Sequence, residues 1–248
     1  MYLPDQPSHA SAHLSRSTAM TQARVAEGSP HSTLDHREIG LSLPERGAKR
    51  LFDLASVVVI LGLFWWAIVI VAIAVRLTSG SPVIFGHKRI GRDGREFNCY
   101  KFRSMVPDAD EVLAHLLAND AQAREEWARD FKLKDDPRIT RVGRFIRKTS
   151  LDEFPQLWNV LMNDMSVVGP RPVVRKELDT YYLGSNRAHY LSVKPGLTGL
   201  WQVSGRNDME YSERVELDRV YVSSWGLWSD FMIVMRTVGV IFRRKGAY

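Results

Sequence analysis

The chain has very little cysteine and lacks the signatures of several common protein classes. Of its 248 residues only Cys99 is a cysteine, which excludes an intramolecular disulfide and a cysteine metal cluster. Zinc-finger spacing, a basic-leucine pattern, a Walker A loop and a dinucleotide-binding fingerprint are all missing. We therefore expect no nucleic-acid partner. The single cysteine agrees with a reducing, cytosol-facing environment.

Residues 1–48 also lack a hydrophobic core pattern and are rich in Ser, His, Ala, Arg and Pro. We expect them to form a disordered N-terminal extension. No apolar signal-peptide stretch follows Met1, so no cleavable signal is expected. The whole chain carries a net charge of +6 and has a pI of about 9.5, which suits anionic lipids or phosphorylated small molecules.

One long apolar run is present, from Leu54 to Val75, and it spans 22 residues. As a straight helix it would be about 33 Å long, which is enough to cross a bilayer. We expect residues 49–80 to form a membrane helix segment. The alternative, a buried core helix, is disfavoured because so long a run with Trp65 and Trp66 exceeds what one soluble core covers.

The flanks of this run are basic on both sides, with Lys49 and Arg50 before it and Arg76 after it. A spanning helix favours positive charge on the cytoplasmic side only. A re-entrant helix, which enters and leaves on one face, would remove the conflict, although Gly62 is the only helix-weakening residue inside the run. The sequence leaves both topologies open.

A small hairpin is expected after the membrane segment, with strands at 81–85 and 96–102 around the turn 91–94. Six basic residues within 86–103 form a juxtamembrane patch that attracts anionic headgroups; they are Lys88, Arg89, Arg92, Arg95, Lys101 and Arg103. Residues 108–133 have a helical pattern and are expected to serve as scaffold.

Asp136 and Pro137 are predicted to start the next helix, because aspartate caps and proline suits the first turn. Arginines recur every three residues from this point and would form a loose basic stripe; they are Arg138, Arg141, Arg144 and Arg147. A solvated face is the better interpretation for each of them except Arg147, which lies five residues before a pair of carboxylates.

That pair, Asp152 and Glu153, lies at a predicted helix start, and residues 150–153 have the form of a capping box. Since Pro155 would fall past the first turn of a helix capped by Ser150, a start nearer Asp152 is the alternative. In either case the positive end of the helix dipole favours ionised carboxylates there. Simple capping remains the competing interpretation.

Two later motifs suit phosphate groups. Pro170 and Pro172 confine the backbone around Arg171, whose guanidinium can grip a phosphate bidentately. Residues 194–207 form a glycine-punctuated loop of a kind that allows close backbone approach to phosphates. Residues 221–242 are apolar with tryptophans and a basic end, and suit an interfacial membrane helix almost as well as a core helix.

Taken in this order, the motifs resemble the small monotopic phosphoglycosyl transferases, the bacterial sugar transferase family. The matching stretches are residues 49–53, 82–92, 100–105, 136–164, 165–172 and 194–207, so the resemblance covers about residues 49–248. The insert at 108–133 and the end at 246–248 look like the succinoglycan-type galactose-phosphate transferases. Where family members often carry Ser-Pro in mid-run, this chain has Trp65 and Trp66.

The resemblance implies a mainly helical α+β fold in which residues 81–248 form a cytosolic catalytic domain on the bacterial inner membrane, with interfacial helices. It implies transfer of a sugar 1-phosphate, here galactose 1-phosphate, from a UDP-sugar to undecaprenyl phosphate with release of UMP, as the first step of exopolysaccharide synthesis. The expected partners are these two substrates and inner-membrane lipids.

By the same resemblance, Asp152 is the nucleophile that forms an aspartyl phosphosugar, and Glu153 helps to hold Mg²⁺. Arg147 and Arg171 bind phosphate oxygens. We expect the substrate site to be completed by five further residues: Lys101, Arg103, Pro170, Pro172 and Arg206.

Three alternatives remain. In the first, the sugar is glucose or an N-acetylamino sugar. The orientation of one sugar hydroxyl is recognised by details of the pocket that the sequence alone does not identify. In the second the chain is a non-catalytic membrane scaffold of polysaccharide export, a hypothesis that the presence of both carboxylates disfavours. The third, a DNA-binding membrane regulator, would require a helix-turn-helix that the sequence does not contain.

Overall fold

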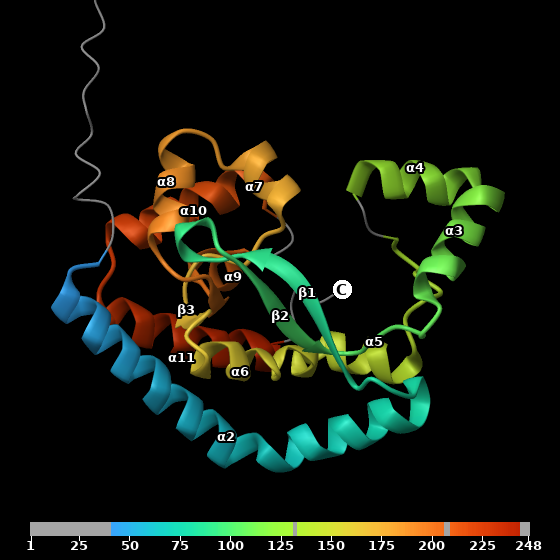
Figure 1. Cartoon of the computed structure of the whole chain (residues 1–248), viewed down its shortest axis with the longest axis horizontal. Helices are drawn as coiled ribbons and strands as arrows, with labels where there is room; N and C mark the ends of the chain where they lie inside the picture. Colours follow the sequence, from blue (N-terminus) through green and yellow to red (C-terminus); the bar gives the residue numbers. More distant parts are fainter. Residues whose placement is uncertain (1–40, 131–132, 206–208, 244–248) are drawn as a thin grey trace, which may run out of the picture. The chain divides into compact units, whose positions relative to one another are not determined.

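The computed structural model of the chain describes residues 41–130, 133–205 and 209–243. Within these ranges the protein is mainly helical with two small sheets, which confirms the predicted α+β class. The helices are α2 (Leu43–Ser79), α3 (Ala109–Asn119), α4 (Ala121–Asp130), α5 (Arg141–Lys148), α6 (Gln156–Leu161), α7 (Arg175–Tyr181), α8 (Ser185–Ser192), α9 (Leu200–Ser204), α10 (Tyr211–Ser223) and α11 (Leu227–Arg243). The strands are β1 (Ile84–Ile90), β2 (Glu96–Phe102), β3 (Ser166–Val168) and β4 (Gly196–Thr198), and the 3₁₀ turns are η1 (Arg92–Gly94) and η2 (Leu151–Glu153) (Figure 1).

Helix α2 contains the apolar run and begins six residues before the predicted membrane segment. The Ser42 backbone N–H donates to the Glu45 carboxylate at 2.7 Å, which caps the helix start. Among the described residues this is the one helix long and apolar enough to cross a membrane. Only 11% of its most apolar 18-residue window is buried, so it is not a core helix. Large apolar side chains, Trp65 and Trp66 among them, are exposed instead.

Both ends of α2 pack against the same unit, and in Figure 1 the helix curves beneath that unit. Near its start, the Asp53 carboxylate accepts hydrogen bonds from Ser166 Oγ at 2.8 Å and from Val167 N at 2.9 Å. Near its end, Val71 and Val75 are buried in a cluster with other apolar side chains of β2 and α5. In the middle of the run Phe64 still contacts Phe154, with ring centroids 5.8 Å apart, while Trp65 and Trp66 on the other face are exposed.

The basic residues before the run are part of this docking. Lys49 is buried and its Nζ donates to the Asp230 carboxylate at 2.7 Å. Arg50 donates to the carbonyls of Val160 at 2.6 Å and Leu161 at 2.9 Å, at the end of α6. From the sequence, Lys49 and Arg50 were expected to flank the membrane run, whereas in the structure both bind protein groups.

The predicted hairpin is present, with β1 and β2 antiparallel from the pair Ile84–Phe102 to the pair Ile90–Glu96. The turn uses Asp93 at φ 58° and Gly94 at φ 76°. The first strand starts three residues later than predicted and runs on to Ile90. Pro82 cannot donate a ladder hydrogen bond, and Gly80 at φ 72° turns the chain at the end of α2.

The second sheet pairs β3 and β4 in parallel and brings two glycines into backbone contact. A Cβ on Gly196 would lie 2.1 Å from the Gly169 nitrogen, so no larger residue fits there. The Gly196 N–H donates to the Pro170 carbonyl at 2.7 Å. This contact fixes the backbone directly before Arg171. Around the sheet lies the main apolar core, which contains Val57, Leu157, Val160, Met165, Val168, Tyr221 and Ile233.

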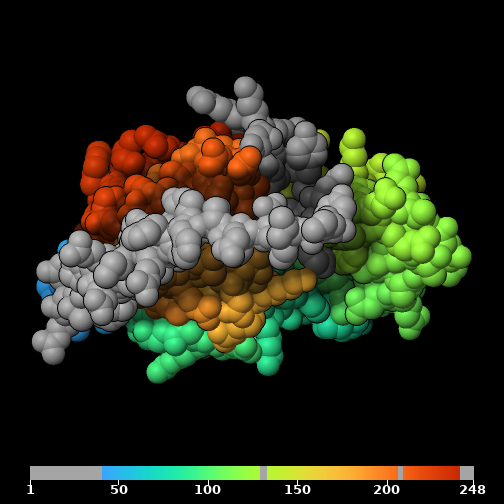
Figure 2. All heavy atoms as spheres, turned by 90° about the horizontal axis from the view of Figure 1, so that it is seen from above, coloured from blue at the N-terminus to red at the C-terminus, as the bar shows by residue number. Residues whose placement is uncertain are grey.

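Three helix boundaries differ from the prediction. The helix predicted from Asp136 begins at Arg141, because Asp136 binds Arg138 while Thr140 Oγ1 accepts from the Gly143 N–H at 2.9 Å and caps α5. The single helix predicted over 108–133 is divided into α3 and α4. These two stand at one end of the described unit, apart from α8 and α10 (Figures 1 and 2). The helix predicted over 221–242 is likewise divided, at residues 224–226.

Candidate active site

Asp152 lies in the 3₁₀ turn η2, between α5 and α6, and is 8% exposed. Ser150 precedes this turn in the left-handed region, at φ 58°, and its side chain makes no capping hydrogen bond. The predicted capping box is therefore wrong, and α6 begins only after Pro155. A non-glycine residue at positive φ costs on the order of 1 kcal/mol or more, and such strain gathers at functional sites.

Lys101 on β2 connects the two carboxylates. Its Nζ donates to Glu153 Oε1 at 2.6 Å and lies 3.9 Å from Asp152 Oδ2. The contact joins the hairpin to η2, two parts of the chain about fifty residues apart. The sequence predicted all three residues as site residues, and the structure brings them together.

The electrostatic environment of Asp152 is unusual for an aspartate. Burial raises the pKa of its carboxyl to about 6, against an ordinary value of 3.8. Lys101 opposes this shift by attracting the ionised form, and the negative charge of Glu153 adds to it. Arg147 also favours the ionised form, more weakly. Perturbation by burial together with specific charged neighbours is typical of functional carboxylates.

Arg147 is on the last turn of α5. The backbone of α5 at Gly143 packs closely against the backbone at Ser104, and this places Arg147 next to Asp152. Its Nε donates to Ser104 Oγ at 2.7 Å, and burial lowers the pKa of its guanidinium. Gly143 permits this geometry, because a Cβ there would lie 1.9 Å from the Ser104 carbonyl oxygen. Of the predicted arginine stripe, Arg147 is thus the member placed near the carboxylates.

A pocket opens beside Glu153, between the hairpin, α6, α9 and the segments before α7 and α9. The residues that line it are Arg89, Cys99, Lys101, Glu153, Gln156, Arg171, Pro172, Gly196, Leu197 and Gln202. The Arg171 guanidinium lies over the Trp201 ring, 5.9 Å from its centroid. Burial lowers the pKa of Arg89, and nearby Arg171 lowers it further, so the pocket is rich in positive charge.

Gln202 also lines the pocket, although the sequence did not predict it as a site residue. Its Oε1 is buried and, within the described part of the chain, has no hydrogen-bond partner. A buried acceptor of this kind is costly unless a ligand supplies a donor. Gln202 lies in the glycine-punctuated segment, but nothing in its spacing distinguishes it. Arg89 was counted only as one charge of the basic hairpin patch.

The other residues predicted to bind the substrate do not all line the pocket. Pro172 lines the pocket, whereas Pro170 is fully buried and fixes the backbone. Arg103 donates to the Ser81 carbonyl at 3.1 Å, where α2 joins the hairpin, and not to the pocket. Arg206 lies outside the described residues.

The described residues contain no group of three or more His, Cys, Asp or Glu side chains arranged to hold a metal ion. Mg²⁺ in phosphoryl-transfer enzymes is bound by one or two carboxylates together with substrate phosphates. The Glu153 carboxylate on the pocket wall, with Asp152 beside it, fits that sparser requirement.

Comparison with known proteins gives a consistent result. A sequence model of the family described as bacterial sugar transferase matches residues 44–244. A relative from Erwinia amylovora named UDP-galactose-lipid carrier transferase is 55% identical over 203 residues, which cover 82% of this chain and 42% of the relative. The undecaprenyl-phosphate galactose phosphotransferase of Salmonella typhimurium is 55% identical over 210 residues, with the same two coverages. The exopolysaccharide production protein ExoY of Rhizobium meliloti is 46% identical over 212 residues, covering 85% of this chain and 93% of the relative.

The chain thus spans less than half of the first two relatives and nearly the whole of the third.

Proposed function

Because the chain belongs to the bacterial sugar transferase family, we propose that it transfers a sugar 1-phosphate from a UDP-sugar to undecaprenyl phosphate, as the first step of exopolysaccharide synthesis. The observation that carries this proposal is the buried Asp152, whose nearest cation is Lys101 and whose neighbour Glu153 lines a pocket rich in arginine and lysine. The names of two relatives favour galactose as the sugar.

The reaction proceeds in two displacements. An oxygen of the Asp152 carboxylate attacks the phosphorus that bears the sugar, and the bond from that phosphorus to the bridging oxygen breaks. UMP leaves with the bridging oxygen, and an aspartyl phosphosugar remains. An oxygen of undecaprenyl phosphate then attacks the same phosphorus and expels the carboxylate. The product is an undecaprenyl-diphosphate sugar.

The protein's contribution is positioning and neutralisation of charge, the main requirements of phosphoryl transfer. Arg171 and Lys101 lie on the pocket wall where the pyrophosphate oxygens of the donor would bind. Arg147, oriented by Ser104, favours the ionised form of Asp152. Glu153 would hold Mg²⁺, which supplies further neutralisation of phosphate charge when it is bound. Splitting the transfer lets the water-soluble donor product leave before the lipid acceptor binds.

The packing of α2 supports one membrane arrangement over the other. A helix that spans the roughly 30 Å hydrocarbon core places its two ends on opposite sides. Here the Lys49–Asp230 pair at one end and the buried Val71 and Val75 near the other bind the same unit. We propose that α2 enters and leaves on the cytoplasmic face, with its exposed apolar middle in the inner membrane and the catalytic unit in the cytoplasm.

The proposal is tested by measuring UMP release from purified, membrane-embedded protein with Mg²⁺ and undecaprenyl phosphate. UDP-galactose, UDP-glucose and UDP-N-acetylglucosamine are compared as donors. Lipid-dependent release with one donor is expected, and that donor identifies the sugar. Folded protein that releases no UMP with any of these donors would contradict the proposal and favour a scaffold role.

A further inference from the structure

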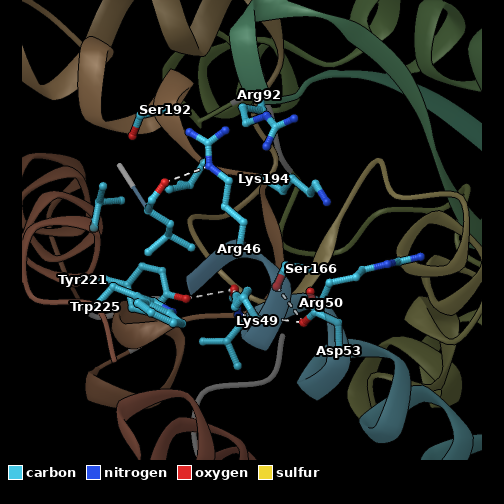
Figure 3. A pocket seen from close by; sticks show the side chains of 14 residues that line it. Arg46, Lys49, Arg50, Asp53, Arg92, Ser166, Ser192, Lys194, Tyr221 and Trp225 are labelled. Atoms are coloured by element: carbon cyan, nitrogen blue, oxygen red, sulfur yellow. Dashed lines mark hydrogen bonds and ion pairs between the residues drawn. The ribbon is translucent and has the colours of Figure 1, made fainter. Parts of the chain in front are cut away.

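A second pocket lies where the first turns of α2 meet η1, β3, α10 and the segment that follows α8 (Figure 3). It shares no lining residue with the catalytic pocket. Its lining is strongly basic, with one carboxylate, Asp53, among five cationic side chains; these are Arg46, Lys49, Arg50, Arg92 and Lys194. Nothing in the proposed transfer reaction requires this pocket.

Two of the five cations have a structural role already. Lys49 is held by the Asp230 carboxylate at 2.7 Å and by the Val168 carbonyl at 2.8 Å. Arg50 caps the end of α6 by donating to two backbone carbonyls. In Figure 3 Lys49 lies between Asp53 and Tyr221 at one end of the pocket, with its Nζ 3.8 Å from Asp53 Oδ1. These contacts explain that end without a ligand.

The other three cations gather at the opposite end of the view and come from three separate elements. Arg46 is on α2, where its Nε donates to the Leu41 carbonyl at 2.8 Å. Arg92 is on η1 and pairs with its neighbour Asp93 at 3.3 Å. Lys194 follows α8 and donates to Asn163 Oδ1. In the described ranges no carboxylate lies within ion-pair distance of Arg46 or Lys194.

This arrangement is costly without an anion, because like charges that converge in a partly enclosed space repel one another. Consistent with this, burial together with the positive charge of Arg92 lowers the pKa of the Lys194 ammonium to about 8. Guanidinium and ammonium groups that converge from several directions match the oxygens of a phosphate group.

We propose that Arg46, Arg92 and Lys194 form a second anion site, which binds the phosphate group of a ligand that is not a substrate of the transfer. The site lies directly before the apolar run, since Asp53 is followed by Leu54. If α2 enters the membrane at that point, Arg46 lies at the level of the lipid headgroups. A phosphate there comes either from an anionic lipid or from a soluble phosphorylated molecule.

The test uses the full chain in nanodiscs of phosphatidylcholine, titrated with inorganic phosphate by calorimetry. Arg46→Gln and Lys194→Gln each remove one cation, and Arg124→Gln on the exposed face of α4 is the matched control for the change in charge. Phosphate is expected to bind the parent at two classes of site, one of them catalytic. Each pocket variant should weaken one class about tenfold, since a charge-assisted hydrogen bond is lost, and Arg124→Gln should weaken neither.

A repeat in nanodiscs that also contain phosphatidylglycerol distinguishes the two sources. If this lipid weakens phosphate binding at the second class and not at the catalytic class, the ligand is an anionic headgroup. If it weakens neither, the ligand is a soluble phosphorylated molecule. The proposal is overturned if folded Arg46→Gln and Lys194→Gln bind phosphate as the parent does, or if Arg124→Gln weakens binding equally. The assay measures no sugar transfer, so its outcome is independent of the proposed catalytic function.

Discussion

Two clusters in this protein combine a lysine with two carboxylates; one is buried and the other is partly exposed, and they differ in how many hydrogen bonds the carboxylates accept. In the docking cluster, Asp53 accepts two hydrogen bonds and Asp230 accepts from Lys49, Tyr221 and Trp225. In the catalytic cluster, Asp152 has Lys101 at 3.9 Å and, among the described residues, no hydrogen bond from another residue.

Hydrogen bonds to a carboxylate stabilise its ionised form and occupy lone pairs that a nucleophile would need. A buried carboxylate with few hydrogen-bond partners keeps lone pairs for a substrate, but its burial lowers the stability of the folded state. We infer that the docking cluster positions α2 and that the catalytic cluster performs the chemistry.

The largest effect is expected for Asp152→Asn. The amide keeps the shape of the side chain but is no nucleophile, so transfer should fall by about 10⁴-fold or more. Stability should be unchanged or higher, because a desolvated carboxylate is removed. UMP release and thermal unfolding, both compared with Asp110→Asn on exposed α3, measure the two effects. Normal turnover by Asp152→Asn would remove the nucleophile assignment.

Asp230→Asn is expected to lower the stability of the protein and to leave its activity nearly unchanged. Breaking the buried ion pair leaves the Lys49 ammonium with Asp53, 3.8 Å away, as its remaining carboxylate partner, and the loss of one partner of a buried pair destabilises a protein by about 3 kcal/mol. Activity per folded molecule should change little, since Asp230 is not in the catalytic pocket. Denaturant unfolding in detergent measures the loss. Equal stability of variant and parent would show that the docking cluster does not hold α2.

Glu153→Gln should change the response to Mg²⁺ more than it changes the fold. The amide is a poor ligand for a hard cation, so the Mg²⁺ concentration needed for half-maximal UMP release should rise about tenfold or more. A titration of Mg²⁺ after chelator treatment measures this shift. An unchanged Mg²⁺ response would count against Glu153 as the metal-holding residue.

Gln202→Leu should reduce kcat/KM for the accepted UDP-sugar by about tenfold, because the buried Oε1 is expected to accept a hydrogen bond from the donor substrate. The fold should not lose stability, since an unsatisfied buried oxygen is removed. Gln122→Leu on exposed α4 is the matched control. If both leucine variants transfer sugar at the parent's rate, Gln202 does not contact the donor.

A third buried carboxylate, Asp218, lies outside both clusters and accepts one hydrogen bond from Tyr182 Oη at 2.7 Å. Burial raises its pKa from an ordinary 3.8 to about 7. The folded state then binds the proton more tightly than the unfolded state, so stability should fall as pH rises from 3.8 to 7. The slope from this group is at most about 1.4 kcal/mol per pH unit.

Asp218→Asn should flatten that part of the pH profile, which chemical unfolding between pH 4 and pH 7 would measure. An identical slope in parent and variant would show that Asp218 is ionised in the fold at neutral pH.

The sequence predicted the fold class, the long apolar helix and the hairpin, because hydrophobic length and turn residues are local signals. It also predicted Lys101, Arg147, Asp152, Glu153 and Arg171 as site residues. It could not predict that Thr140, and not Asp136, begins α5, because that depends on which partner Asp136 binds. Gln202 could not be predicted as a site residue for the same reason, because its Oε1 lacks a hydrogen-bond partner only in the packed structure. Lys49 looked like a flanking membrane charge until its partner Asp230, far away in the sequence, was in place.

Mass spectrometry can detect the covalent phosphosugar proposed at Asp152. Purified protein would be mixed with UDP-galactose and Mg²⁺ without lipid acceptor, quenched and digested. The peptide containing Asp152 is expected to gain the mass of a hexose phosphate less one water, and undecaprenyl phosphate is expected to remove this added mass. Active protein that transfers sugar to the lipid while this peptide never gains the mass would exclude the covalent intermediate and indicate direct transfer.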